Sequence, residues 1–233
     1  MARDELHPQE VIVPVLGRDS SDANLRLLGT GSIVGDGSVL LTADHVVAAC
    51  PGQLFINTVL DPTTHWPIEV AERDDRHDLA LLRINGHRPN RPLTPLFEFP
   101  FHENWDILTF EYSTTREEQG QIRLSPAARR GHITRMLTVD TLGRAGDDAL
   151  EVSFPAVRGA SGAPVMYDQP GFGIIGVLIS NALYHLLPAE VQVSLNAANT
   201  LVDEVKYLLP QGIAVNVRHL RPMYERVVGP AMT

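Results

Sequence analysis

Three side chains of the types used in acyl transfer occur in this 233-residue chain, each beside an apolar run or a tight turn. His45 follows one apolar run, Asp78 directly precedes another, and Ser161 lies between glycines in the segment 158–165. A serine hydroxyl becomes nucleophilic when a histidine takes its proton and a carboxylate orients the imidazole. Neighbouring glycines let backbone N–H groups approach the oxyanion that forms. The order His, Asp, Ser predicts a site assembled from distant strand ends.

Each of these features taken alone also has a structural explanation. A Gly/Ser/Pro segment is common in turns, a single histidine is often a satisfied core or turn residue, and an aspartate at a strand end often caps a turn. A metal site formed by His45, His77 and Asp78 is disfavoured, because these residues lack helical ligand spacing and the serine would remain unexplained. We therefore expect a reaction that uses neither metal nor cofactor.

Composition narrows the range of partners. The chain has 19 Lys and Arg against 28 Asp and Glu, and the resulting net charge of −9 argues against nucleic-acid binding. No apolar run has the length of a membrane span, and the N-terminus lacks the apolar run of a secretory signal, which favours a cytoplasmic location. Cys50 is the single cysteine, so no intrachain disulfide can form.

Short runs of β-forming residues separated by turns dominate the chain and predict an all-β protein in two halves. A proline-rich stretch between them is expected to be a linker. The expected units are 9–88 with His45 and Asp78, the linker 89–101, 102–218 with Ser161, and a C-terminal helix and tail at 219–233. Strands are expected at Val11–Leu16, Leu25–Val34, Gly37–Thr42, Gln53–Val59, Ile68–Glu72, Leu79–Ile84, Ile107–Tyr112, Gln121–Leu124, His132–Val139, Leu150–Phe154, Ala163–Tyr167, Gly173–Ser180 and Gly212–Val217.

Helical signals occur late in the chain. Apolar residues from Leu201 to Leu209 follow helical spacing after a capping-box pattern at Thr200, and Pro210 ends the run. This predicts a helix within the stretch 182–211, which is longer than a simple hairpin connection. A second short helix is expected at His219–Val228.

Four motifs occur in this order along the chain: Gly29–Ser32, Leu41–Val47, His77–Leu82 and Gly159–Val165. By these motifs the chain resembles the trypsin-like (chymotrypsin-fold) serine peptidases, and most closely their disulfide-free bacterial HtrA-like branch. Four motifs carry this resemblance, and two weaker ones follow at Ile175–Ser180 and Gly212–Val217; together they cover roughly residues 10 to 220. The resemblance implies two six-stranded antiparallel β-barrels.

By this resemblance His45 is the general base, Asp78 its orienting carboxylate and Ser161 the nucleophile, and the N–H groups of Gly159 and Ser161 form the oxyanion hole. Three positions depart from the family pattern. Ala160 replaces an aspartate that many members pair with a new N-terminus after zymogen cleavage, so that route of activation is lacking. Ala163 replaces a glycine, and Asp44, where alanine is common, could raise the imidazole pKa or face solvent.

The resemblance also places a primary specificity pocket. Its base falls near Pro155 and one wall near Gly212. Pro155, Ala156 and Val157 offer no carboxylate for a basic side chain, so an apolar or small side chain is expected before the cleaved bond. Arg158 offers a second alternative, a preference for an acidic side chain. The residues expected in the pocket are Pro155, Ala156, Val157, Ile179, Ser180 and Gly212.

These observations predict a serine endopeptidase that cleaves a protein or peptide substrate through an acyl-enzyme, and one dedicated or gated target would fit the expected location. The alternative is a protease-like binding module that stays inactive until an activator or an associated regulatory subunit engages it. Hydrolysis of a small ester or amide by the same three residues is a third alternative.

Overall fold

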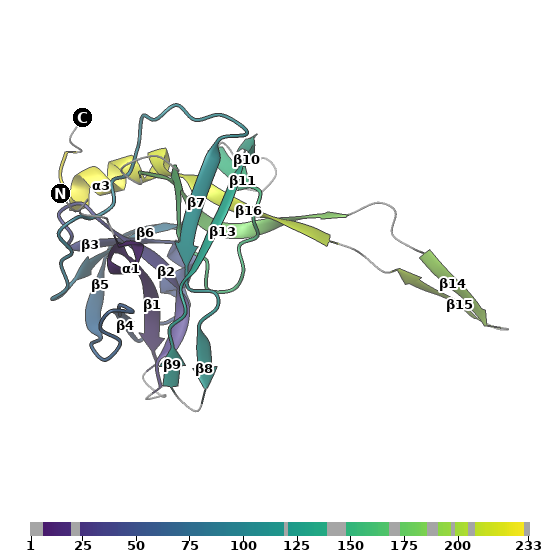
Figure 1. Ribbon diagram of the computed structural model, residues 1–233, viewed down its shortest axis with the longest axis horizontal. Coiled ribbons are helices and arrows are strands. Elements are labelled where there is room, and N and C mark those ends of the chain that lie inside the picture. The colour runs from purple at the N-terminus through teal and green to yellow at the C-terminus, as the bar shows by residue number, and fades with distance from the viewer. Residues whose placement is uncertain are drawn as a thin grey trace, which may run out of the picture.

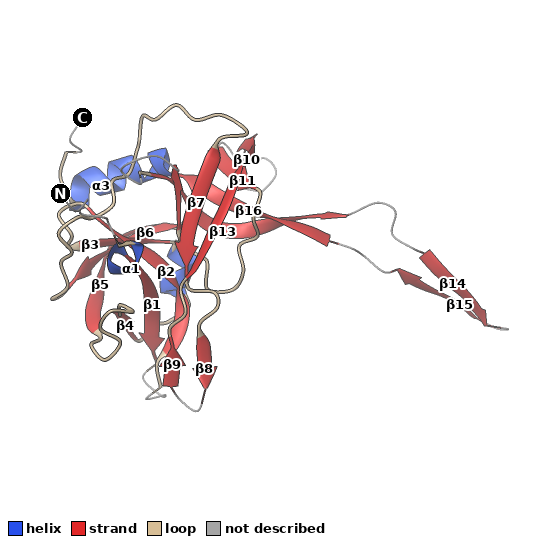
Figure 2. Cartoon of the chain, in the orientation of Figure 1, coloured by secondary structure: helices blue, strands red, loops and turns tan. Residues whose placement is uncertain are grey.

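Two closed barrels of six antiparallel strands form the body of the protein in this computed structural model, which describes residues 7–19, 24–118, 121–138, 148–167, 173–185, 191–196, 199–204 and 208–230 (Figures 1 and 2). The expected all-β class and double barrel are confirmed. The first barrel has the order β1 (Ile12–Arg18), β2 (Arg26–Val34), β3 (Val39–Thr42), β6 (Leu79–Ile84), β5 (Trp66–Asp74), β4 (Gln53–Ile56). The second has the order β10 (Ala127–Thr138), β11 (Asp148–Val152), β16 (Leu208–Asn216), β13 (Ile174–His185), β12 (Pro164–Tyr167), β7 (Asp106–Glu111).

Strands β3 and β6 are apolar on both faces because each face meets a different core. Leu40, Ala80 and Leu82 belong to the core of the first barrel. The alternate residues, Leu41 and Leu81 among them, pack in a second cluster with residues of the other barrel such as Leu108, Met166 and Val177. Burying a leucine side chain contributes about 1.5–3 kcal/mol. This shared core fixes the two strands that end beside His45 and begin after Asp78.

The stretch between β6 and β7 is hydrogen-bonded to both barrels. The N–H of Leu93 donates to the Ile33 carbonyl of the first barrel at 2.8 Å. Ile174 of the second barrel accepts from the N–H of Leu96 at 2.8 Å and donates to the carbonyl of Thr94 at 2.9 Å. The proline-rich stretch that the sequence favours as a linker therefore follows a defined path along both barrels.

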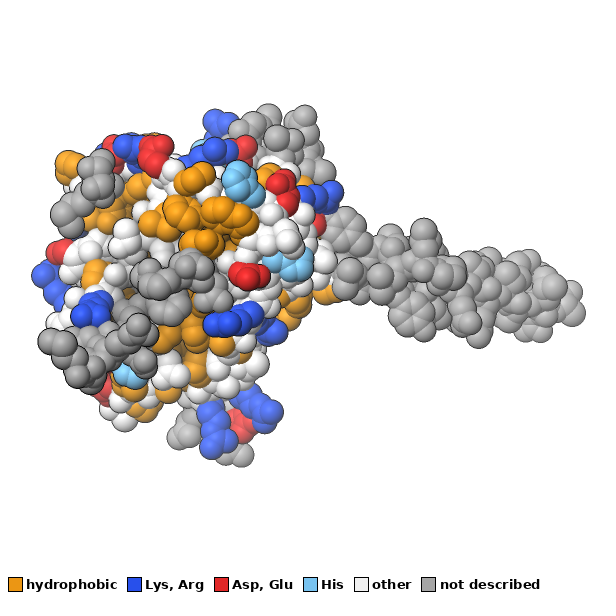
Figure 3. Space-filling model, turned by 45° about the horizontal axis from the view of Figure 1, so that its top comes forward, with side chains coloured by type: hydrophobic (Ala, Val, Ile, Leu, Met, Phe, Trp, Pro, Cys, Tyr) orange, Lys and Arg blue, Asp and Glu red, His pale blue; other side chains and the backbone are white. Residues whose placement is uncertain are grey.

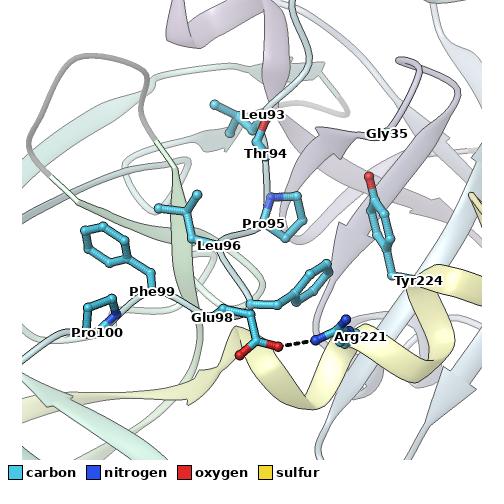
Figure 4. A pocket seen from close by; sticks show the side chains of 11 residues that line it. Gly35, Leu93, Thr94, Pro95, Leu96, Glu98, Phe99, Pro100, Arg221 and Tyr224 are labelled. Atoms are coloured by element: carbon cyan, nitrogen blue, oxygen red, sulfur yellow. Dashed lines mark hydrogen bonds and ion pairs between the residues drawn. The ribbon is translucent and has the colours of Figure 1, made fainter. Parts of the chain in front are cut away.

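The expected C-terminal helix is confirmed as a 3₁₀ turn η2 (Val217–Leu220) followed by α3 (Arg221–Val227). Leu220 and Tyr224 are buried against the shared core. A cavity of about 430 Å³ lies between α3 and the connecting stretch, where Figure 4 shows Tyr224 beside Gly35 and the Arg221–Glu98 ion pair.

The helix predicted at Leu201–Leu209 is wrong. The chain instead forms β14 (Val191–Asn196) and β15 (Asn199–Glu204), which pair as an antiparallel hairpin, and β16 already begins at Leu208. A short apolar run fits helix and strand almost equally well, and pairing with β14 decides the outcome here. In Figure 1 this hairpin lies beyond the ends of β13 and β16, away from the barrels.

Several short elements were not expected from the sequence. They are α1 (Pro8–Val11), α2 (Asp44–Ala48) and β8 (Arg116–Glu118). β8 pairs in a small two-stranded sheet with β9 (Gln121–Arg123), which falls where a strand was expected. None of the helices in the described part of the chain has the length and apolar character needed to cross a membrane. On the face drawn in Figure 3, acidic and basic side chains are interspersed, and apolar side chains gather in its upper middle.

Candidate active site

Asp78 holds both the ring and the backbone of His45. Its Oδ2 lies 2.7 Å from Nδ1 of His45, and its Oδ1 accepts the N–H of His45 at 2.8 Å. Its carbonyl accepts the N–H of Asp44 at 3.1 Å, so one residue satisfies two of the free N–H groups at the start of α2. The contact fixes Nδ1, and Nε2 remains as the ring nitrogen that can take a proton.

Burial and backbone conformation reinforce this arrangement. Asp78 is 7% exposed and adopts a left-handed φ of 57°, a conformation that aspartate tolerates better than most residues. The His45 side chain, in contrast, is 46% exposed. The carboxylate is thus shielded and rigid, whereas the imidazole remains accessible.

The segment that carries Ser161 is tied to both barrels. The N–H of Thr30 in β2 donates to the carbonyl of Ser161 at 2.8 Å. On the other side, the N–H of Gly162 donates to the Leu178 carbonyl at 2.7 Å, and the N–H of Leu178 donates to the Ala163 carbonyl at 2.9 Å. Ser161 is therefore held between β2 of the first barrel and β13 of the second.

Two glycines permit this close approach of backbones. Gly162 has a φ of 84°, and a Cβ there would lie 2.1 Å from Oγ1 of Thr42 and 2.2 Å from the carbonyl oxygen of Thr30. A Cβ on Gly29 would lie 2.6 Å from the carbonyl oxygen of Ser161. These contacts explain why one glycine belongs to the Gly29–Ser32 motif and the other follows the serine.

A tight turn precedes Ser161. The N–H of Ala160 donates to the Val157 carbonyl at 2.8 Å, and Gly159, the third residue of this turn, has a φ of 93°. A positive φ at that position is the signature of a type II turn. In this turn the peptide group that carries the Gly159 N–H points in the opposite direction from that in a type I turn.

Thr30 fixes this turn from the first barrel. Its hydroxyl donates to the carbonyl of Gly159 at 2.7 Å and accepts the N–H of Tyr112 at 3.1 Å. Thr30 is fully buried. Both hydrogen-bonding functions of its hydroxyl are therefore used to join three segments that are far apart in the sequence.

The departures from the family pattern are accommodated by packing and by an ion pair. Ala160 and Ala163 are buried, at 1% and 0% exposure. Asp44 neither faces solvent nor stands alone beside His45, because Nε and Nη2 of Arg73 donate to its two oxygens at 2.5 and 2.9 Å. The hydrogen bond to Asp44 raises the pKa of Arg73.

The neighbouring His77 belongs to a different cluster. Its Nδ1 lies 2.6 Å from Oδ2 of Asp74, and its ring stacks on His219 at 4.4 Å between centroids. Burial alone would raise the pKa of Asp74, but the hydrogen bonds from His77 outweigh it and the pKa is lowered. These contacts give His77 a structural explanation.

The residues expected in the specificity pocket lie on three segments, which are the stretch before Ser161, β13 and β16. Ala156 is buried and Val157 is exposed, and in β13 the residues Ile179 and Ser180 are half-buried. Gly212 of β16 donates its N–H to the carbonyl of Phe154 at 2.8 Å. Arg158 lines a separate cavity of about 210 Å³ with Leu27, Ser113, Thr115, Glu117 and Gly159.

Sequence reasoning missed Asn181, which joins β13 to the stretch that carries Ala156. Its Oδ1 accepts the N–H of Ala156 at 2.7 Å, and its Nδ2 donates to the carbonyl of the same residue at 2.5 Å. The only sequence signal is its place directly after Ser180, at the end of one of the weaker motifs.

The family profile described as a trypsin-like peptidase domain matches residues 29–177, a region that contains His45, Asp78 and Ser161. The chain belongs to the trypsin-like peptidase family. It is thus a serine endopeptidase by membership, and proteins or peptides are its substrate class. Among curated proteins no match was found.

Solved structures with the same fold include proteases of the HtrA type. The active form of the Rv3671c protease from M. tuberculosis matches with a TM-score of 0.63 at 14% identity, over 97% of this chain and 83% of that one. The MamO protease domain from Magnetospirillum magneticum matches with 0.60 at 17%, over 92% and 96%. The HtrA-type protease AlgW, solved with a tripeptide, matches with 0.63 at 14%, over 94% of this chain, which spans 60% of the length of AlgW.

Proposed function

We propose that this peptidase cleaves peptide bonds through an acyl-enzyme formed on Ser161, with His45 as general base and Asp78 as its orienting carboxylate. The observation that carries the proposal is the double contact of Asp78 with the ring and the N–H of His45. A buried carboxylate bound to Nδ1 selects the tautomer whose Nε2 accepts a proton, and it stabilises the imidazolium that follows.

The reaction proceeds in two halves. Oγ of Ser161 attacks the substrate carbonyl while Nε2 of His45 takes its proton, and the same proton passes to the leaving amine as the peptide bond breaks. Water then attacks the acyl-enzyme, His45 takes its proton, and the acid leaves as the proton returns to Ser161. In each half the N–H groups of Gly159 and Ser161 stabilise the oxyanion.

The turn at Val157–Ala160 supports this oxyanion site. Its type II form, with Gly159 at a φ of 93°, is held by the hydroxyl of Thr30. Ala160 has no charge with which to pair a new N-terminus, so the turn does not depend on such an ion pair.

The domain and pocket assignments follow from the same interpretation. The first barrel, 9–88, supplies His45 and Asp78, the stretch 89–101 connects it to the second barrel, 102–218, and the helix and tail occupy 219–233. The side chain before the cleaved bond enters between the three segments that carry Pro155, Ala156 and Val157, Ile179 and Ser180, and Gly212.

Labelling with an alkyl fluorophosphonate, read by intact-protein mass, tests the proposal. The wild-type protein should gain one adduct on Ser161, and Ser161→Ala should gain none. Ser38→Ala, which removes a hydroxyl from the β2–β3 hairpin, is the matched control and should label like the wild type. A folded wild-type protein that gains no adduct would overturn a preassembled site and favour the protease-like module that waits for an activator.

A further inference from the structure

Asn181 joins the two segments that flank the nucleophile. Val157, on one segment, accepts a hydrogen bond from Ala160, the residue before Ser161. On the other segment, Leu178 is bonded to Gly162 and Ala163, the two residues after Ser161. The space between Ala156 and Asn181 therefore lies beside Ser161, where the family resemblance puts the side chain of the residue whose carbonyl is attacked.

The side-chain amide of Asn181 reaches from β13 to the backbone of Ala156. It satisfies both the N–H and the carbonyl of Ala156, at 2.7 and 2.5 Å. Ala156 is only 8% exposed, so a side chain that displaced the amide would leave two backbone groups in need of new partners. The amide is thus held by two hydrogen bonds that a substrate side chain would have to replace.

An irregularity in β13 brings Asn181 into this position. Leu178 pairs with Ala214 of β16 and Ser180 pairs with Ile213, so Ile179 is an extra residue in the ladder. Such a bulge re-aims the side chains that follow it. Asn181 then pairs with Gly212 of β16 while its side chain reaches Ala156 on the opposite segment.

We infer that Asn181 limits the depth of the primary specificity pocket, so that the enzyme accepts only small side chains, such as those of alanine or serine, before the cleaved bond. The inference rests on the proposed function of Ser161. None of the flanking residues Pro155, Ala156, Val157, Ile179 and Ser180 has an ionisable side chain. These positions therefore offer no charge that would bind a longer, charged substrate side chain in spite of the restricted depth.

Peptidyl diphenyl phosphonates that differ only in the first side chain, alanine against phenylalanine, test the inference. They add covalently to a serine nucleophile, so intact-protein mass gives a second-order rate constant for each. The wild-type protein should prefer the alanine probe by at least about tenfold, a discrimination that the fit of a side-chain pocket can supply. Asn181→Gly should raise the ratio of the phenylalanine to the alanine rate constant by at least about tenfold.

Two further variants separate the effect of pocket depth from a general effect of the glycine substitution. Asn181→Ala retains a Cβ and should shift the ratio in the same direction by a smaller factor. Asn85→Gly, a matched change at an exposed asparagine after β6, should leave it unchanged. The alanine-probe rate constant of Asn181→Gly should stay within about threefold of the wild type, which shows that the nucleophile is intact.

Two kinds of result would contradict the inference, and they can be told apart. Equal reaction of the wild-type protein with both probes, or an unchanged ratio in Asn181→Gly and Asn181→Ala, would overturn the role of Asn181 while alkyl fluorophosphonate labelling of Ser161 remained. Loss of that labelling in the wild type would instead overturn the proposed function, and the inference would fall with it.

Discussion

At the scale of single residues, the positive charge of Arg73 balances the negative charge of Asp44, the residue next to His45. Asp44 is buried and Arg73 donates two hydrogen bonds to it, while the Arg73 side chain is 43% exposed. Arg73→Met should leave the carboxylate buried without this partner. Because solvent screens the exposed guanidinium, we expect a loss of about 1–2 kcal/mol in the free energy of unfolding.

Urea denaturation of Arg73→Met and of the double variant Asp44→Asn, Arg73→Met measures this loss. The double variant removes the charge as well as its partner and should recover most of the stability. Equal stability of Arg73→Met and the wild type would show that the ion pair contributes nothing beyond what water supplies.

The residues of the proposed catalytic site could be predicted because each belongs to a local pattern. His45, Asp78 and Ser161 each stand at the end of an apolar run or between glycines, and such patterns are visible within a short stretch of sequence. Asn181 and Thr30 could not be found in this way. Each acts through a side-chain bond to the backbone of a residue 25 or 129 positions away, and no local pattern encodes such a contact.

At the scale of elements, the loop between β11 and β12 depends on one glycine. Gly162 combines a positive φ with backbone and side-chain atoms of the first barrel that would lie 2.1–2.2 Å from an added Cβ. Gly162→Ala should cost about 3 kcal/mol or more of unfolding free energy, since both the conformation and the contact are violated. It should also slow fluorophosphonate labelling of Ser161, because relief of the clash moves the adjacent residue.

Gly229→Ala is the matched control for this effect. Gly229 has a φ of 107°, but no atom would lie within 4 Å of a methyl group added there, so only the conformational cost of about 1 kcal/mol applies. Thermal or urea unfolding of both variants measures the difference. If the two lose the same stability, the close approach at Gly162 carries no energetic weight.

A strand was predictable where its own residues required two buried faces. β6 falls at Leu79–Ile84 as expected, because its continuous apolar run needs two buried faces and only a strand between two cores provides them. The helix prediction for Leu201–Leu209 failed because the spacing of its apolar residues fits a helix. The strand that pairs with part of it, β14, carries no comparable pattern in its own sequence. Pairing between segments, rather than propensity within one, determined this element.

At the scale of the whole molecule, the proposed site works only if the two barrels keep their relative position. His45 and Asp78 belong to the first barrel and Ser161 to the second. The shared apolar core holds the barrels together but is not directional. Direction comes from β2, where Thr30 binds Ser161 through its N–H and Gly159 through its hydroxyl.

Thr30 is therefore expected to act as a positioning residue across the barrel interface. Thr30→Val keeps the shape of the side chain but removes the hydroxyl, which leaves the Gly159 carbonyl and the Tyr112 N–H without this partner. The free energy of unfolding should fall by about 1–3 kcal/mol. The fluorophosphonate labelling rate should fall by about tenfold or more, because the turn that orients the Gly159 N–H is no longer fixed.

Thr30→Ser retains the hydroxyl and should restore the labelling rate even though it loses a buried methyl group. A Thr30→Val protein that is destabilised but labels as fast as Thr30→Ser would limit Thr30 to packing, and the alignment of the barrels would then rest on the shared core alone.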